Sequence, residues 1–303
     1  MSIARRLLLG AVLTAVLVGP GRAAVLRPCG RAAPIGAEQQ DLTLRFAAIV
    51  KAELERSGPG AVLIARSGID LARFGFRTSH AGIALKASRN GPWSVRQLYY
   101  ACDEARPRLF DQGVAGFLLG ADAAAATHVS IVLLPETAAA ALERATLDDV
   151  VALDLLGVRY SANAFAFSLD YQNCNQWVAE MLAASWAPPG ESDVAAPRAR
   201  AQRWLRERGY VPSVFEVGNP TLMWLAGLAE LLHVDDHPAE DIAGLRFRVS
   251  MPASIEAFVA STVPGAQRIE FCRSDRHAVV HRGWDPIADG CRPGQDDELV
   301  ALD

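Results

Sequence analysis

Residues 80–100, HAGIALKASRNGPWSVRQLYY, contain two apolar runs that flank a polar turn at residues 86–91. The runs are rich in the aliphatic, β-branched and aromatic residues that strands favour, and the turn holds an Asn-Gly dipeptide. This pattern predicts a β-hairpin whose first strand begins at His80.

The register of the hairpin determines which side chains share a face with His80. A two-residue turn at residues 90–91 places His80 opposite Ala101, whereas a wider loop places it opposite Gln97. Side chains alternate along a strand, so both registers put Gln97, Tyr99 and Ala101 on the His80 face. We expect Gln97, and after it Tyr99, to orient the imidazole; the alternative for Gln97 is an ordinary solvent-facing strand residue.

The second informative segment is residues 171–177, YQNCNQW, which opens an apolar helix expected over residues 173–186. Asn173 is a favourable N-cap, and Gln176 three residues later suits a capping box. Cys174 then lies in the first turn, where free N–H groups and the helix dipole stabilise a thiolate. Cys174 is therefore a candidate nucleophile; a half-cystine or a quiet buried residue are the alternatives.

A cysteine nucleophile needs a histidine base that a third polar group holds in place. His80 stands at the start of the hairpin and is the first candidate for this base. His128 begins a similar apolar strand, expected over residues 128–134, and is the second candidate.

Composition excludes several classes of protein. Of 303 residues, 51% are apolar and 21% are charged, which excludes a wholly disordered chain. Lys and Arg number 30 against 34 Asp and Glu, without a basic block, so nucleic acid is not an expected partner. His277 and His281 are the best-spaced pair of metal ligands, but two ligands do not form a zinc site, so we expect no metal and no cofactor.

The amino terminus is typical of a secretory signal peptide. Arg5 and Arg6 precede an apolar run over residues 7–18, and small residues follow it. The run is shorter than the roughly 20 residues that a membrane anchor needs. We expect cleavage after Ala23, which removes three arginines and leaves 27 Lys and Arg against 34 Asp and Glu, a net charge of −7. The mature protein is then expected to be periplasmic or secreted, without a membrane span.

The remaining segments mix helical and strand patterns without a βαβ repeat, which predicts an α+β fold. A Pro- and Ala-rich stretch over residues 187–200 is the best linker candidate, so we expect a core over residues 24–190 and a C-terminal extension over residues 191–303. We also expect a loop with a short helix over 103–126, a strand region within 150–167 and a loose acidic tail over 294–303.

Five cysteines leave at least one thiol without an intramolecular partner. Cys272 and Cys291 bracket 18 residues and suit a disulfide in an oxidising compartment. A second pair, Cys29 with Cys102, would leave Cys174 free, whereas a Cys102–Cys174 pair would remove the candidate nucleophile.

Four motifs, SHAGIAL, VRQLYYACDE, LFDQG and YQNCNQWV, together resemble an uncharacterised bacterial family of secreted proteins, domain-of-unknown-function family 2145. The resemblance covers most of residues 40–280. The order of a His strand followed by a Cys helix also resembles the circularly permuted papain-like superfamily, which includes NlpC-like cell-wall amidases and lecithin–retinol acyltransferase-like enzymes.

The superfamily resemblance implies a permuted papain-like core, with a small antiparallel sheet, packed helices and a C-terminal α/β extension. It implies Cys174 as nucleophile, His80 as base and Gln97 as orienting residue. The superfamily often has His, Glu or Asn at the third place. The neutral Gln97 can hold the ring but cannot stabilise an imidazolium as a carboxylate does.

The same resemblance implies a thiol hydrolase or acyltransferase that acts on amide or ester bonds of cell-envelope peptides or lipids. The oxyanion would be bound by the Cys174 backbone N–H and by a nearby amide such as Gln172, with Asn173, Asn175 and Tyr99 lining the cleft. The alternative is a non-catalytic periplasmic envelope-binding module of the same fold.

Overall fold

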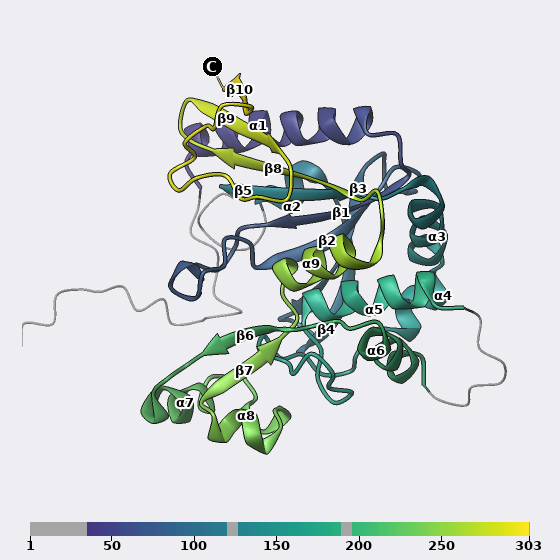
Figure 1. Ribbon diagram of the computed structural model, residues 1–303, viewed down its shortest axis with the longest axis vertical. Helices are drawn as coiled ribbons and strands as arrows, with labels where there is room; N and C mark the ends of the chain where they lie inside the picture. Colours follow the sequence, from purple (N-terminus) through teal and green to yellow (C-terminus); the bar gives the residue numbers. More distant parts are fainter. Residues whose placement is uncertain (1–34, 120–126, 189–195, 303) are drawn as a thin grey trace, which may run out of the picture. The chain divides into compact units, whose positions relative to one another are not determined.

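The computed structural model describes residues 35–119, 127–188 and 196–302, and it shows an α+β protein built on an eight-stranded antiparallel sheet (Figure 1). The strand order is β10-β9-β8-β5-β1-β2-β3-β4. The predicted signal peptide over residues 1–23, and Cys29, lie outside the described residues.

The sheet strands are β1 (Ala61–Arg66), β2 (His80–Leu85), β3 (Ser94–Ala101), β4 (Arg106–Gly113), β5 (His128–Leu133), β8 (Gln267–Arg273), β9 (His277–Arg282) and β10 (Glu298–Ala301). The helices are α1 (Ala37–Arg56), α2 (Val114–Leu119), α3 (Glu136–Leu147), α4 (Asp149–Asp154), α5 (Cys174–Trp186), α6 (Pro197–Glu207), α7 (Pro220–Ala226), α8 (Ala239–Ala243) and α9 (Pro252–Thr262), with short 3₁₀ turns at Ala72–Phe74 and Val234–Asp236. A separate two-stranded sheet pairs β6 (Ser213–Glu216) with β7 (Arg246–Val249).

The sheet separates two apolar cores because side chains alternate along each buried strand. In β1 every residue is buried, with Val62 and Ile64 in the core that includes α1 and α2. Leu63 and Ala65 belong to the opposite core, which includes α3, α5 and α9. The central strands are therefore apolar on both faces, and this explains their unbroken hydrophobic runs.

The predicted hairpin is present as β2 and β3. Its register lies midway between the two registers that the sequence suggested. Ile83 pairs with Arg96, and the ladder continues from there toward the turn. The parity is as predicted, since Gln97 and Tyr99 contact His80. Beyond Ile83 the ladder stops, so residues 80–82 of β2 have no partner on β3.

Three local predictions are wrong. Residues 106–113 form β4, an edge strand whose polar residues gain backbone partners from β3, where a loop was expected. Residues 149–154 form helix α4, begun by the side chain of Asp148, where a strand was expected. The acidic tail is not loose, because β10 pairs with β9.

The sheet is also larger than the small sheet expected. Strand β8 pairs with β5 and is followed in the sheet by β9 and β10. The C-terminal strands therefore complete the same sheet as the hairpin, across the predicted boundary near residue 190. Within the described residues, no helix has both the length and the apolar character that crossing a bilayer demands.

Candidate active site

Helix α5 begins where the sequence predicted, with Cys174 as its first residue. The side chain of the N-cap, Asn173, accepts a hydrogen bond from the backbone N–H of Gln176 at 2.7 Å. The Gln176 side chain does not complete a capping box, because it donates to the backbone oxygens of Ala166 and Ser168 instead. The cap holds Cys174 at the amino end of a helix that is buried in the core.

The thiol of Cys174 is free and almost fully buried, with 7% of the residue exposed. Burial raises the pKa of Cys174 to about 11. The backbone N–H of Asn175, the positive charge of Arg66, and the N–H groups of Cys174 and Ala81 act in the opposite direction on this pKa. The sulfur is thus a neutral thiol at pH 7, beside backbone donors that favour a negative charge when one forms.

Asn175 ties the start of α5 to the start of β2. Its Oδ1 accepts from the backbone N–H of Ala81 at 2.9 Å, and its Nδ2 donates to the backbone oxygen of Ser79 at 3.1 Å. These two groups flank His80, at the place where β2 has lost its β3 partner. The Asn175 amide therefore substitutes for strand pairing and fixes the Cys helix against the His strand.

A chain of hydrogen bonds holds the imidazole of His80. Its Nε2 lies 2.7 Å from Oε1 of Gln97, and Nε2 of Gln97 donates to Oε1 of Gln112 at 2.7 Å. Because Oε1 of Gln97 only accepts, Nε2 of His80 carries the proton and Nδ1 is the basic nitrogen. The predicted contact between Gln97 and His80 is present, and it selects one tautomer.

Two aromatic rings and one cation surround the same imidazole. His80 stacks on Tyr99 with ring centroids 4.6 Å apart and lies 5.9 Å from the ring of Phe117 in α2. Burial and the positive charge of Arg66 lower the pKa of His80 to about 3, against the opposing effect of the hydrogen bond that His80 donates to Gln97. His80 is therefore neutral across the physiological range.

The structure does not join the candidate nucleophile and the candidate base by a hydrogen bond within the residues that it describes. The ring of His80 contacts Phe117, on the α2 side of the sheet, whereas Cys174 packs in the core of α5. The two residues approach from opposite faces at the first residues of β2. The resting pair is a neutral thiol and a neutral imidazole.

Gln172 lies in a different environment from the one expected for an oxyanion donor. Its Nε2 donates to the backbone oxygen of Leu155 and to Glu180, and its Oε1 accepts from the N–H of Gly157. The side-chain amide is thus fully engaged, with one donor on a backbone oxygen and one on a buried carboxylate. The backbone N–H of Asn175 lies near the sulfur instead.

His128 lies at a second site. Its Nε2 is 3.6 Å from Sγ of Cys272, which forms the predicted disulfide with Cys291. Strand β1 separates β5, which carries His128, from β2. Cys102 is disulfide-bonded, and Cys174 is free, so the rival Cys102–Cys174 pair does not form.

Arg66 is the residue of this region that sequence reasoning missed. Its Nη2 donates to the hydroxyl of Tyr99 at 2.5 Å, and its guanidinium lies over the Phe117 ring at 5.3 Å. Its charge lowers the pKa of both Cys174 and His80. The available signal was a basic residue at the end of the otherwise apolar run AVLIAR.

Gly82 allows β3 to approach the His80 strand. A Cβ atom there would lie 2.5 Å from Cγ1 of Val95, 3.0 Å from the backbone oxygen of Arg96 and 3.3 Å from Cβ of Gln97. We expect Gly82→Ala to lower the free energy of unfolding by about 1–3 kcal/mol, measured by urea denaturation. Gly113→Ala in β4 is the control, since no atom lies within 4 Å there; equal losses in both variants would contradict the close-approach argument.

A comparison with protein families finds a match over most of the chain. The family model described as "Uncharacterized protein conserved in bacteria (DUF2145)" matches residues 53–259, which is more than half of the chain. The match includes the hairpin, Arg66 and the start of α5. No curated protein and no solved structure matches the chain.

Proposed function

We propose that this chain, which belongs to the bacterial family of uncharacterized conserved proteins DUF2145, is a cysteine hydrolase or acyltransferase with Cys174 as nucleophile and His80 as base. The observation that carries the proposal is the pair of hydrogen bonds from Asn175 to the backbone on either side of His80. Through them the residue next to the only free cysteine of the described residues holds the start of the His strand. The superfamily resemblance implies a Cys helix that abuts the His strand, and these two hydrogen bonds support that part of it.

The proposed chemistry starts from the neutral pair. As a carbonyl carbon approaches Sγ of Cys174, Nδ1 of His80 takes the thiol proton and the C–S bond forms. The oxyanion is stabilised by the backbone N–H groups of Cys174 and Asn175 at the start of the helix. His80 then returns the proton to the leaving amine or alcohol, and water or a second acceptor cleaves the thioester.

This chemistry requires the imidazole and the thiol to meet where β2 and β3 diverge. Catalytic hydrogen bonds are often absent from unliganded enzymes and form with substrate. The exposed fraction of both residues is small, 7% each, so substrate entry must open the end of β2. Gln97 occupies Nε2 of His80 in this structure, which leaves Nδ1 for the proton transfer.

The proposed substrates are amide or ester bonds in cell-envelope peptides or lipids, which the superfamily resemblance suggests. The signal-like amino terminus supports a periplasmic or secreted location for this chemistry. A non-catalytic envelope-binding module is the second candidate. The thiol of Cys174 is buried with a raised pKa, and it makes no hydrogen bond to His80 among the described residues. Both observations favour a site that holds a ligand without reacting.

The test uses electrophilic acyl and peptidyl probes on the mature protein, with intact mass and peptide mapping as the readout. We expect one adduct per chain, on Cys174, with at least about a hundredfold slower formation in His80→Ala, which is the loss typical of a missing general base. His128→Ala is the matched control, because His128 lies at the Cys272 disulfide. Adduct formation that is absent, or that is unchanged in His80→Ala, would leave the binding module as the better description.

A further inference from the structure

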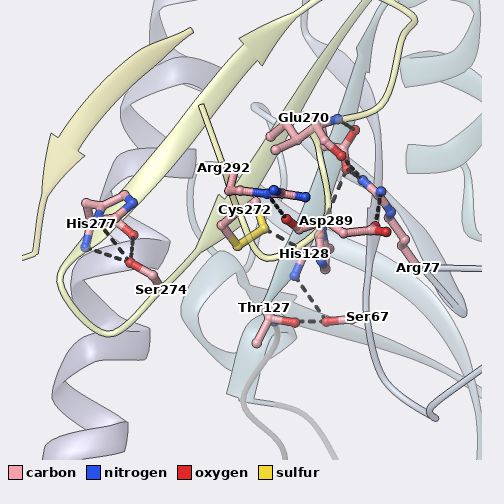
Figure 2. Close-up of a disulfide and its surroundings, with 12 residues drawn as sticks. Ser67, Arg77, Thr127, His128, Glu270, Cys272, Ser274, His277, Asp289 and Arg292 are labelled. Carbon is pink, nitrogen blue, oxygen red and sulfur yellow. Dashed lines mark hydrogen bonds and ion pairs between the residues drawn. A yellow bond between two sulfur atoms is a disulfide. The ribbon is translucent and has the colours of Figure 1, made fainter. Parts of the chain in front are cut away.

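The disulfide between Cys272 and Cys291 lies in a ring of polar side chains that has no part in the proposed hydrolase (Figure 2). Nε2 of His128 and the two sulfur atoms all lie within 4.8 Å of one another. Cys272 is fully buried, Cys291 is 8% exposed, and the His128 side chain is 19% exposed. The cluster is thus closed on the sulfur side and reachable along the imidazole.

The spacing of these atoms matches a tetrahedral thiolate–imidazole zinc centre. Zinc binds cysteine sulfur at about 2.3 Å and histidine nitrogen at about 2.0–2.1 Å, so a tetrahedral angle places the N and S atoms about 3.6 Å apart. Nε2 of His128 lies 3.6 Å from Sγ of Cys272. The imidazole of His128 therefore already lies at the distance from Sγ of Cys272 that a shared zinc ion requires, with Nε2 directed at the sulfur.

Glu270 supplies the outer partner that metal-bound histidines commonly have. Its Oε1 lies 3.5 Å from Nδ1 of His128, the nitrogen that faces away from the sulfur atoms. This Nδ1 is buried without a hydrogen-bond partner. A carboxylate behind a ligating histidine fixes the ring and strengthens the ligand. Arg268 in turn holds the Glu270 carboxylate at 3.0 Å.

Bonds other than the disulfide hold the loop that carries Cys291. Arg77 donates to the backbone oxygen of Ile287 and binds Asp289 at 2.6 Å, and the N–H of Ile287 donates to Glu270 at 3.2 Å. Figure 2 shows Arg77, Asp289 and Glu270 beside the disulfide. Reduction of the S–S bond therefore leaves Cys291 tied near Cys272.

We propose that Cys272, Cys291 and His128 form a redox-controlled site for a thiophilic divalent ion of the zinc class, closed by the disulfide and opened by a dithiol reductant. The dithiol breaks the S–S bond, supplies two electrons and becomes a disulfide itself, leaving two protein thiols. Zn²⁺ then displaces one proton from each thiol and forms two Zn–S bonds and one bond to Nε2 of His128. Water takes the fourth position.

The test measures binding of Co²⁺ and Zn²⁺ to the full chain in a Cys29→Ser/Cys102→Ser/Cys174→Ser background, in which Cys272 and Cys291 are the two cysteines that remain of the five in the sequence. After reduction and anaerobic removal of the dithiol, we expect one Co²⁺ per chain with sulfur-to-cobalt charge-transfer bands that Zn²⁺ displaces. The oxidised protein should bind none. His128→Ala and Glu270→Gln should each bind at least about tenfold more weakly.

His281→Ala is the matched control, because this histidine contacts Asp297 and lies outside the cluster. Its affinity for zinc should equal that of the background protein. Circular dichroism follows the fold of each reduced sample with and without zinc. The proposal is overturned if the reduced protein binds no stoichiometric metal, if His128→Ala binds as tightly as the background, or if reduction unfolds the chain and zinc does not restore it.

Discussion

Arg198→Met is expected to lower the free energy of unfolding by about 3–5 kcal/mol, the cost of leaving a buried carboxylate without its partner. Glu180 is fully buried in α5, and Arg198 of α6 binds both of its oxygens, at 2.9 and 3.1 Å. Gln172 and Gln202 donate to the same carboxylate. Urea denaturation of the variant at pH 8 measures the loss.

The same substitution should loosen the approach to the candidate nucleophile. Arg198 also donates to the backbone oxygens of Ser168, Leu169 and Tyr171, in the segment that leads into α5. Adding Glu180→Gln to Arg198→Met removes the unpaired charge and keeps an acceptor. We expect the double variant to regain part of the lost stability; a double variant less stable than Arg198→Met would show that the charge is not the cause.

The pH dependence of the Arg198→Met defect has a definite sign. Burial raises the pKa of Glu180, and Arg198 is the largest opposing cause, so its removal raises this pKa further. The pKa of an unfolded glutamate is about 4.3. When the pKa in the folded protein is higher than this, the protein loses stability as the pH rises from the unfolded pKa to the folded pKa. The difference between wild type and variant should therefore shrink from pH 8 toward pH 5. A constant difference would exclude ionisation of Glu180 as its source.

Local patterns predicted the His and Cys elements correctly. Alternation along β3 is a property of the strand itself, so Gln97 and Tyr99 were placed beside His80 without knowledge of the register. The N-cap of α5 likewise depends on Asn173 and its next few residues. The true register was missed because the loop runs over residues 86–93, longer than either turn considered, and the N–H of Trp93 closes it on the oxygen of Leu85.

Features that depend on a pairing partner more than on their own residues were not predictable in this way. Strand β4, with the sequence RPRLFDQG, is polar and reads as a loop until β3 pairs with it. The tail strand β10 forms only because β9 offers an open edge. His128 and Cys272 are 144 residues apart and meet through the pairing of β5 with β8. The sequence therefore indicated no metal ligands there.

The buried imidazole should make the protein sensitive to acid in a range where an exposed histidine would not. His80 has a pKa of about 3 in the fold, against about 6.5 in an unfolded chain. Between these values the unfolded state binds a proton that the folded state does not, so stability falls as the pH falls. The slope from this one group is at most about 1.4 kcal/mol per pH unit.

Unfolding free energies from pH 7.5 to 4.5 measure this slope in wild type and in His80→Gln. Other groups titrate in the same range, so the difference between the two slopes isolates His80. We expect the variant to be flatter below pH 6.5. Equal slopes would mean that His80 titrates in the fold as it does in the unfolded chain.

Two further variants should change the pKa of His80 in opposite directions. They separate the effect of the Arg66 charge from that of the hydrogen bond to Gln97. Arg66→Met removes the positive charge that lowers the pKa of His80, so this pKa rises and the acid sensitivity becomes smaller. Gln97→Leu removes the hydrogen bond that raises the pKa of His80, so acid destabilisation extends below about pH 3, and the unfolding measurements for this comparison continue into that range. Because each comparison uses a slope, a constant loss of packing energy cancels. Changes of the same sign in both variants would contradict the electrostatic account of this site.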